Sequence, residues 1–116
     1  MQGMEGEMLK GHLDMIVLAA LSAAGSAHGY AVIEEIKRRS GGAFDLPEGT
    51  IYPALHRLEQ RGWVSAKWET APDRNREFKY YRLTEKGKKQ LVVEESQWKQ
   101  MSEAVARVMW PPVEEI

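Results

Sequence analysis

Side chains that can form hydrogen bonds recur on one side of residues 48–63 at the spacing of a helix. Ile51, Leu55 and Leu58 fall at i, i+4 and i+7, which stacks them on one helical face. The opposite face holds small or polar residues and no large aliphatic group: Gly49, Thr50, Pro53, His56, Arg57 and Gln60. A face of this kind can enter a groove of DNA and meet base edges and phosphates. The pattern therefore predicts a DNA-recognition helix.

The sequence also marks the two ends of this helix. Pro47 disfavours helix immediately before it, so a turn or minimal strand is expected over 44–46. The helix is expected to begin within 48–50. If Thr50 is its N-cap, Pro53 lies in the first turn, where backbone amides are unpaired anyway. Gly62 can adopt the left-handed conformation that ends a helix.

The composition predicts one ordinary domain and excludes several kinds of site. The chain has 116 residues, of which 43% are hydrophobic, enough for a modest core. It contains no cysteine, which excludes disulfide frameworks and thiolate metal sites. No stretch approaches the roughly 20 apolar residues of a membrane span, and the N-terminus lacks the pattern of a signal peptide. We therefore expect a soluble cytoplasmic protein that does not enter a membrane.

The charges are unevenly distributed, although the net charge is only −1. Residues 50–86 hold eight Lys or Arg and five Asp or Glu, so the basic excess coincides with the candidate helix and the segment after it. A protein with few cationic contacts should bind DNA with a shallow salt dependence unless two copies act together. Dimerisation would therefore help DNA binding.

Two further helices are expected before the candidate recognition helix. Apolar residues over 9–24 form a stripe wide enough for a helix buried on more than one side, ending near Gly25. Ser26 is a fair N-cap for the second helix. The Ser-Gly-Gly run at 40–42 is expected to end it.

A β-hairpin is expected after the candidate helix. Apolar and polar residues alternate over 64–68 and again over 78–81, which is the period of a strand. The segment between them, 71–76, contains proline, aspartate and asparagine, which are typical of turns, and two arginines. The hairpin could therefore act as a charged wing.

A long helix is expected to close the fold, with Thr84 as its N-cap and an end near Met109 before two prolines. Its apolar residues form a sparse seam with a heptad-like spacing: Leu91, Trp98, Met101, Val105 and Val108. Such a seam indicates that the helix packs against another chain.

Three helices, a hairpin and a long last helix are the order of a mainly α (α+β) winged helix-turn-helix with a dimerisation helix. We predict a DNA-binding domain over 9–83 and a C-terminal dimerisation helix over 84–110. Three motifs closely resemble the PadR family of bacterial transcriptional regulators: HGY at 28–30, EGTIYPALHRLE at 48–59 with Gly62-Trp63, and YYRLTEKG at 80–87. The resemblance is greatest to the short branch with a single C-terminal helix, including its acidobacterial type.

The resemblance implies a homodimer whose third helices enter successive major grooves of a dyad-symmetric operator on double-stranded DNA. Such proteins are usually repressors that a small molecule releases. By position, the implied DNA-binding residues are Gly29 and Tyr30 on the second helix, Thr50, Tyr52, Pro53, His56 and Arg57 on the third, Arg74, Asn75 and Arg76 in the wing, and Tyr81 and Arg82 after it.

The resemblance also implies a site for an effector. Drug-responsive members carry a tryptophan on the last helix that stacks flat ligands, and Trp98 lies at the matching distance after the Leu-Thr pair at 83–84. A small hydrophobic or aromatic effector is therefore expected beside Trp98. The alternative is that Trp98 fills a closed dimer interface together with the other seam residues.

Two further alternatives remain open from the sequence. Tyr52 lies at the flank of the apolar stripe and could pack against the body instead of meeting DNA. The whole chain could instead be a winged-helix interaction module that does not bind DNA specifically.

The three histidines match no metal motif, and the glycines form no phosphate-binding loop. We therefore expect neither an enzyme nor a bound metal or cofactor.

Overall fold

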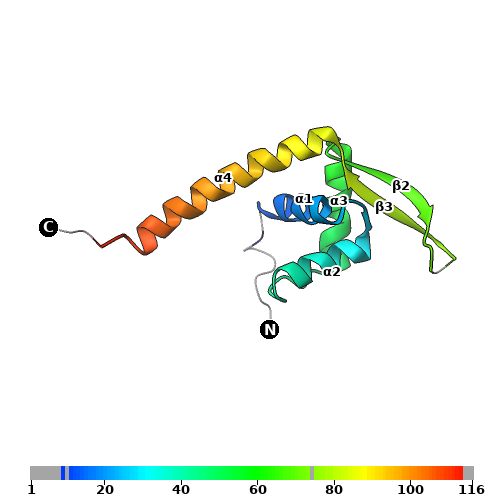
Figure 1. The fold of residues 1–116 in the computed structure, drawn as a ribbon, viewed down its shortest axis with the longest axis horizontal. Coiled ribbons are helices and arrows are strands. Elements are labelled where there is room, and N and C mark those ends of the chain that lie inside the picture. Colours follow the sequence, from blue (N-terminus) through cyan, green and yellow to red (C-terminus); the bar gives the residue numbers. More distant parts are fainter. Residues whose placement is uncertain (1–8, 10, 74, 114–116) are drawn as a thin grey trace.

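The computed structural model describes residues 9, 11–73 and 75–113. Its elements in chain order are α1 (Leu13–Ala24), β1 (Ala27–His28), α2 (Gly29–Arg39), α3 (Glu48–Gln60), β2 (Val64–Thr70), β3 (Glu77–Leu83) and α4 (Glu85–Met109). The first three helices pack together, the β2–β3 hairpin projects on one side, and α4 runs across α1 and projects on the other side (Figure 1). The predicted α+β winged-helix fold is confirmed.

The core lies where α1, α2 and α3 meet. The predicted stripe of α3, Ile51, Leu55 and Leu58, is completely buried against α1 and α2. Burying a side chain of this size contributes about 1.5 to 3 kcal/mol. The inner face of α3 is therefore firmly anchored, and the same anchoring turns the polar face of the helix outward.

Helix α2 begins later than predicted. Its N-cap is His28, whose Nδ1 accepts a hydrogen bond from the backbone N–H of Ala31 at 3.2 Å. The prediction of Ser26 as the N-cap was wrong, because Ala27 and His28 pair with β3 as the short strand β1. The chain is held in an extended conformation there and turns into a helix only at Gly29.

Helix α3 begins at the first residue of the expected range, 48–50. It starts at Glu48 with Pro47 at the N-cap position, so the prediction of Thr50 as the N-cap was wrong. Pro53 consequently lies inside the helix, where it cannot donate to the carbonyl of Gly49. Gly49 is exposed, so water can satisfy that carbonyl. Residues 44–46 form neither a strand nor a regular turn.

The hairpin forms as predicted, and β3 also pairs with β1, giving an antiparallel sheet in the order β1-β3-β2. In this register Tyr81 lies opposite both Ala66 and Ala27, so Tyr81 is on the buried face of the sheet. Tyr80 lies on the other face, opposite His28. The strand β1 is only two residues long and carries no sequence pattern that would have revealed it.

Helix α4 starts from a fixed point. Thr84 is its N-cap, as predicted: its Oγ1 accepts from the N–H of Gly87 at 3.0 Å and donates to the carbonyl of Gly62 at 2.7 Å. The N–H of Thr84 also donates to the carbonyl of Trp63 at 3.1 Å. These bonds attach the start of α4 to the end of α3. None of the helices within the described residues is long and apolar enough to cross a membrane.

Candidate nucleic-acid interface

The outer face of α3 lies between the start of α2 and the hairpin, and its side chains are short or polar. Pro53, His56 and Gln60 are exposed along this face, and Thr50 is partly exposed at its edge. Because the opposite face is locked into the core, these side chains are presented by a rigid helix. Rigid presentation lowers the entropy lost when side chains bind a groove.

Tyr52 both packs against α2 and reaches the surface. Its ring lies against the Cα of Gly29, in the space that a β carbon at Gly29 would occupy. The side chain nevertheless remains 36% exposed. Gly29 itself is buried, so its contribution is to admit the Tyr52 ring. Burial and, secondarily, the charge of Glu48 raise the pKa of Tyr52, so its hydroxyl keeps its proton to a higher pH than that of an ordinary tyrosine.

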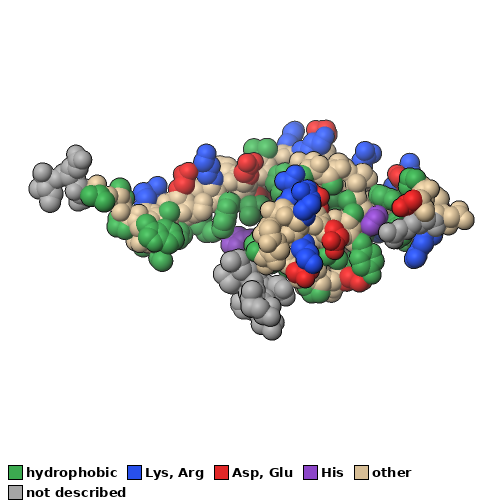
Figure 2. Space-filling model, turned by 60° about the horizontal axis from the view of Figure 1, so that its bottom comes forward, with side chains coloured by type: hydrophobic (Ala, Val, Ile, Leu, Met, Phe, Trp, Pro, Cys, Tyr) green, Lys and Arg blue, Asp and Glu red, His purple; other side chains and the backbone are tan. Residues whose placement is uncertain are grey.

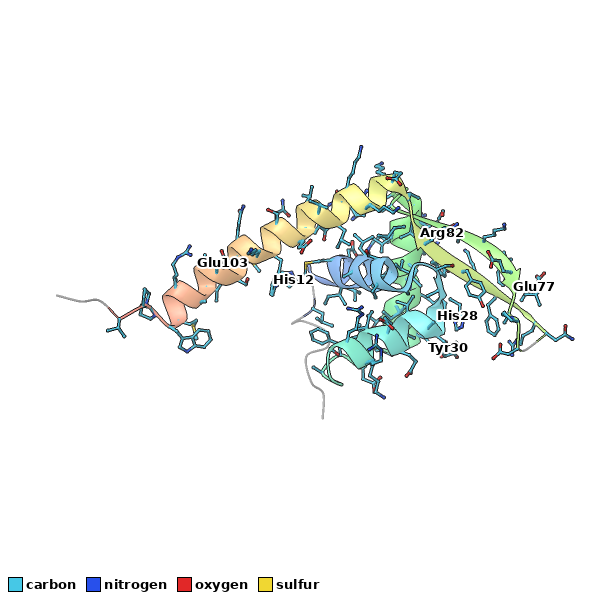
Figure 3. The ribbon with its side chains drawn as sticks, viewed as in Figure 1. His12, His28, Tyr30, Glu77, Arg82 and Glu103 are labelled. Atoms are coloured by element: carbon cyan, nitrogen blue, oxygen red, sulfur yellow. The ribbon has the colours of Figure 1, made fainter. Side chains whose placement is uncertain are left out.

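Tyr30 joins the starts of α2 and α3. Its hydroxyl donates a hydrogen bond to Oε2 of Glu48 at 2.7 Å, and its ring stays exposed. This bond and the charge of Glu48 raise the pKa of Tyr30. Figure 3 shows Tyr30 and His28 at the end of α2 that faces the hairpin. Tyr30 therefore lies at the edge of the surface formed by α3.

Arg57 has a partner that the sequence did not reveal. Its guanidinium donates to Oδ1 of Asp14 on α1 at 2.6 Å, and Arg61 donates to Oδ2 of the same residue at 3.3 Å. Asp14 lies 43 residues before Arg57 in the chain, so no local pattern could have linked them. A guanidinium has five N–H donors, so Arg57 retains some for a phosphate. Its role in DNA binding stays a prediction.

The described residues of the wing present cations and a tight turn. Asn75 adopts a left-handed conformation with φ of 48°, and the guanidinium of Arg76 lies 5.1 Å from the centre of the Phe78 ring. Both residues are exposed, as is Arg82 near the base of the hairpin. Arg74 lies outside the described residues.

Tyr81 does not lie on this surface. It is only 5% exposed and packs in the core, because its register position faces Ala66 and Ala27. Lys79 Nζ lies 5.5 Å from the centre of its ring, which further covers it. We therefore leave Tyr81 out of the candidate DNA surface, against the prediction that it contacts phosphate.

The seam of α4 divides into three parts. Leu91 packs against the core of its own chain, whereas Val105 and Val108 lie beyond the body and are exposed. Between them, Trp98 and Met101 line a groove of about 170 Å³ that α4 forms with Gly11, His12 and Met15. The ring of His12 meets Trp98 edge-on with 5.0 Å between centres.

Among the described residues, no three acidic or histidine side chains converge as a metal site.

Comparisons with known proteins agree with this architecture. The model of the transcriptional regulator PadR-like family matches residues 17–93. A PadR-like transcriptional regulator from Bacillus cereus has a TM-score of 0.77 and 26% identity, over 90% of this chain and 98% of the other. A PadR family regulator from Eggerthella lenta has a TM-score of 0.75 and 28% identity, over 91% and 88% of the two chains.

A curated relative is also similar along most of its length. An uncharacterised protein of Lysinibacillus sphaericus is 30% identical over 99 residues, which are 85% of this chain and 89% of the relative. The family model covers α1 from Val17 onward, all of α2 and α3, the whole hairpin and the first part of α4. The chain therefore belongs to the PadR-like family of transcriptional regulators.

Proposed function

We propose that the chain is a homodimeric repressor that binds a dyad-symmetric operator through α3 and releases it when an effector binds beside Trp98. The observation that carries the DNA-binding part is the outer face of α3. Its exposed side chains are short or polar, and its buried face fixes their direction. A helix with these properties, flanked by a wing, fits the major groove.

The contacts divide by position on the surface. His56 and Gln60 lie on the outermost line of α3 and can reach base edges, while Pro53 offers an apolar surface to a thymine methyl group. Arg57 lies nearer α1, where it would contact a phosphate. Tyr30 and Arg76, at the two edges, would hold the backbone on either side.

The proposed dimer rests on the amphipathic character of α4. Val105 and Val108 are 50% and 81% exposed in the single chain. Figure 2 shows hydrophobic side chains gathered along one side of the projecting part of α4, with charged side chains along the other. Burying such a face against a second copy would remove this apolar area from water. The dimer would need recognition helices about 34 to 36 Å apart.

Effector release would act through the same helix. The groove beside Trp98 lies between α1 and α4, so a flat ligand inserted there would change the angle between the two helices. A changed angle alters the spacing of the two recognition helices and weakens binding to a fixed operator. The groove is small, and a second protomer would enlarge the site by adding its own wall.

The test is a fluorescence anisotropy titration of labelled duplexes with the purified full-length protein at two salt concentrations. One duplex comes from the upstream region of the protein's own gene and the other has the same base pairs scrambled. We expect preference for the native duplex, weakened by salt. His56→Ala should reduce that preference by about 1 to 3 kcal/mol if His56 reads a base. Lys99→Ala, which removes an exposed cation on α4, serves as the control.

The outcomes separate the proposal from its alternative. Equal, salt-sensitive binding to both duplexes would mean that the operator lies outside the upstream region tested. Absence of binding even at low salt would overturn the proposal and favour a winged-helix interaction module. In that case, pull-down experiments with the wild-type protein and with the Val108→Glu variant would test whether α4 binds a protein partner.

A further inference from the structure

His28 touches two different parts of the candidate DNA surface with one ring. It is the N-cap of α2, where Nδ1 accepts the N–H of Ala31 at 3.2 Å. Because Nδ1 acts as the acceptor, the neutral ring carries its proton on Nε2. The cap fixes the orientation of the imidazole relative to the start of α2, which carries Gly29 and Tyr30.

The faces and edges of the same ring contact the wing. The imidazole stacks on Phe78 with 4.9 Å between ring centres and an angle of 27°. It also meets Tyr80 edge-on at 5.5 Å. Phe78 in turn lies under the guanidinium of Arg76, 5.1 Å from the ring centre. A continuous series of ring contacts therefore runs from the cap of α2 to the cation at the wing tip.

Backbone pairing with β1 holds only the inner end of the wing, and next to it Lys79 on β3 donates to Oε1 of Glu59 on α3 at 3.4 Å. Strand β1 pairs with Tyr80 and Tyr81 only, at the inner end of β3. Beyond that point β2 and β3 form a two-stranded ribbon, and its Trp68 is 62% exposed. Isolated two-stranded ribbons are marginally stable in water. The contact between His28 and Phe78 lies at the place where the ribbon leaves the body.

We propose that His28 fixes the wing relative to α2 and is thereby a positioning residue for DNA binding. It acts through Phe78 and Arg76, without itself contacting the duplex. Its ring keeps the wing cation at a set distance from Tyr30 and from the outer face of α3, so that all three reach the same duplex. The DNA-binding consequence rests on the proposed function, whereas the anchoring of the wing does not.

Two substitutions separate the roles of the cap and the ring. His28→Asn keeps an acceptor that is among the best N-caps but removes the ring. We expect this variant to keep a melting temperature close to that of the wild type. Its backbone amide hydrogens over 71–77 should, however, exchange with solvent faster. Its DNA binding should depend less on salt, by about 0.9 in the logarithmic slope for each phosphate that the wing no longer neutralises. His28→Phe keeps a ring but removes the acceptor of the cap. It should have a lower melting temperature but the wild-type amide exchange over 71–77 and the wild-type salt slope of DNA binding.

A second route tests the same contact from the wing. Phe78→Leu should also speed exchange over 71–77 and reduce the salt slope, and combining it with His28→Asn should add nothing further. The proposal would be overturned if His28→Asn kept the wild-type amide exchange and salt slope. It would also be overturned if His28→Phe showed the same faster exchange and smaller slope as His28→Asn. If the wild-type protein binds no duplex, the proposed function fails, but faster exchange in His28→Asn still supports the anchoring of the wing.

Discussion

The carboxylate of Asp14 accepts a hydrogen bond from the guanidinium of Arg57 at 2.6 Å and so connects the first turn of α1 to the last turn of α3. Arg61, the C-cap residue of α3, reaches the other carboxylate oxygen at 3.3 Å. The side chain of Asp14 is 19% exposed, so its charge is partly shielded from water. One carboxylate therefore neutralises part of the charge that α3 would offer to DNA.

Asp14→Asn should release both arginines to phosphates. We expect tighter binding to native and scrambled duplexes alike, with a steeper salt dependence and a lower ratio between the two. The partly exposed ion pair contributes about 1 kcal/mol at most, so unfolding by urea should shift only slightly. Anisotropy titrations at several salt concentrations measure the effect.

The control for this substitution is Glu35→Gln. Glu35 also binds two arginines, Arg38 at 2.7 Å and Arg39 at 2.6 Å, but at the C-terminal end of α2, away from the wing. It should leave DNA affinity nearly unchanged. Weaker binding by Asp14→Asn would mean that Asp14 holds Arg57 in its binding orientation instead of restraining it.

Gly29→Ala should displace Tyr52. The added β carbon would occupy the position of the ring, and the end of the ring can swing into solvent because the side chain is already 36% exposed. We expect a stability cost of about 1 kcal/mol and a loss of DNA affinity equal to that of Tyr52→Ala. In the double variant the two losses should not add. Additive losses would show that Gly29 acts independently of Tyr52.

Gly87 and Gly49 form a matched pair of helical glycines with opposite surroundings. A β carbon at Gly87 would collide with the backbone carbonyl of Trp63, which cannot move because it accepts the N–H of Thr84. Gly87→Ala should therefore cost about 3 kcal/mol through overpacking. Chemical denaturation of the two variants in parallel measures the difference.

Gly49→Ala should have the opposite effect on stability. Nothing lies within 4 Å of a β carbon at Gly49, so alanine should stabilise α3 by about 0.5 to 1 kcal/mol. If DNA approaches the start of α3 closely, the same variant should nevertheless bind DNA more weakly. A gain in stability with unchanged affinity would place the DNA farther from Gly49.

The elements that the sequence predicted well are those whose signal is local. The buried stripe of α3, the alternation in the hairpin and the Thr84 cap each depend on residues close together in the chain. The cap of α2 was missed because Ala27 and His28 are drawn into a strand by β3, more than 50 residues later. Thr50 is not the cap of α3, because Pro47 occupies the N-cap position and the helix starts at Glu48, the first residue of the expected range.

The features of the candidate site also divide into those that local sequence predicts and those that it does not. The exposed positions of α3 could be identified from helical spacing alone, because exposure follows from the buried stripe. The contact between Asp14 and Arg57 and the burial of Tyr81 could not, since both depend on how distant segments meet. The stacking of His28 on Phe78 likewise requires the register of β1 against β3.

Tyr81 should make the fold sensitive to alkaline pH. Its burial raises the pKa of its hydroxyl above the ordinary value near 10, with a smaller opposing effect from Lys79. The unfolded chain therefore loses this proton first as the pH rises, and folding stability falls above about pH 10 but is fully present below it. Urea denaturation from pH 8 upward should show this fall, and Tyr81→Phe should make it smaller. An identical fall in the variant would assign it to other groups.

Introducing negative charge on the seam of α4 should separate the proposed protomers without unfolding them. Val105 and Val108 are exposed in the single chain, so Val105→Glu with Val108→Glu removes little packing from the folded protomer. In a symmetric dimer, however, the new carboxylates would face apolar side chains and one another, which costs several kcal/mol. Sedimentation velocity should then show a monomer whose melting curve remains cooperative.

The same variant should lose most of its affinity for a two-site operator, because a monomer holds only one half-site and gains nothing from the second. Val92→Glu is the matched control. Val92 is also exposed on α4, but at about 100° per residue it lies on the side opposite the seam. It should sediment and bind as the wild type does. Equal dissociation by both variants would indicate a dimer that uses the opposite face of α4, and a monomer that still binds the operator tightly would refute the requirement for two recognition helices.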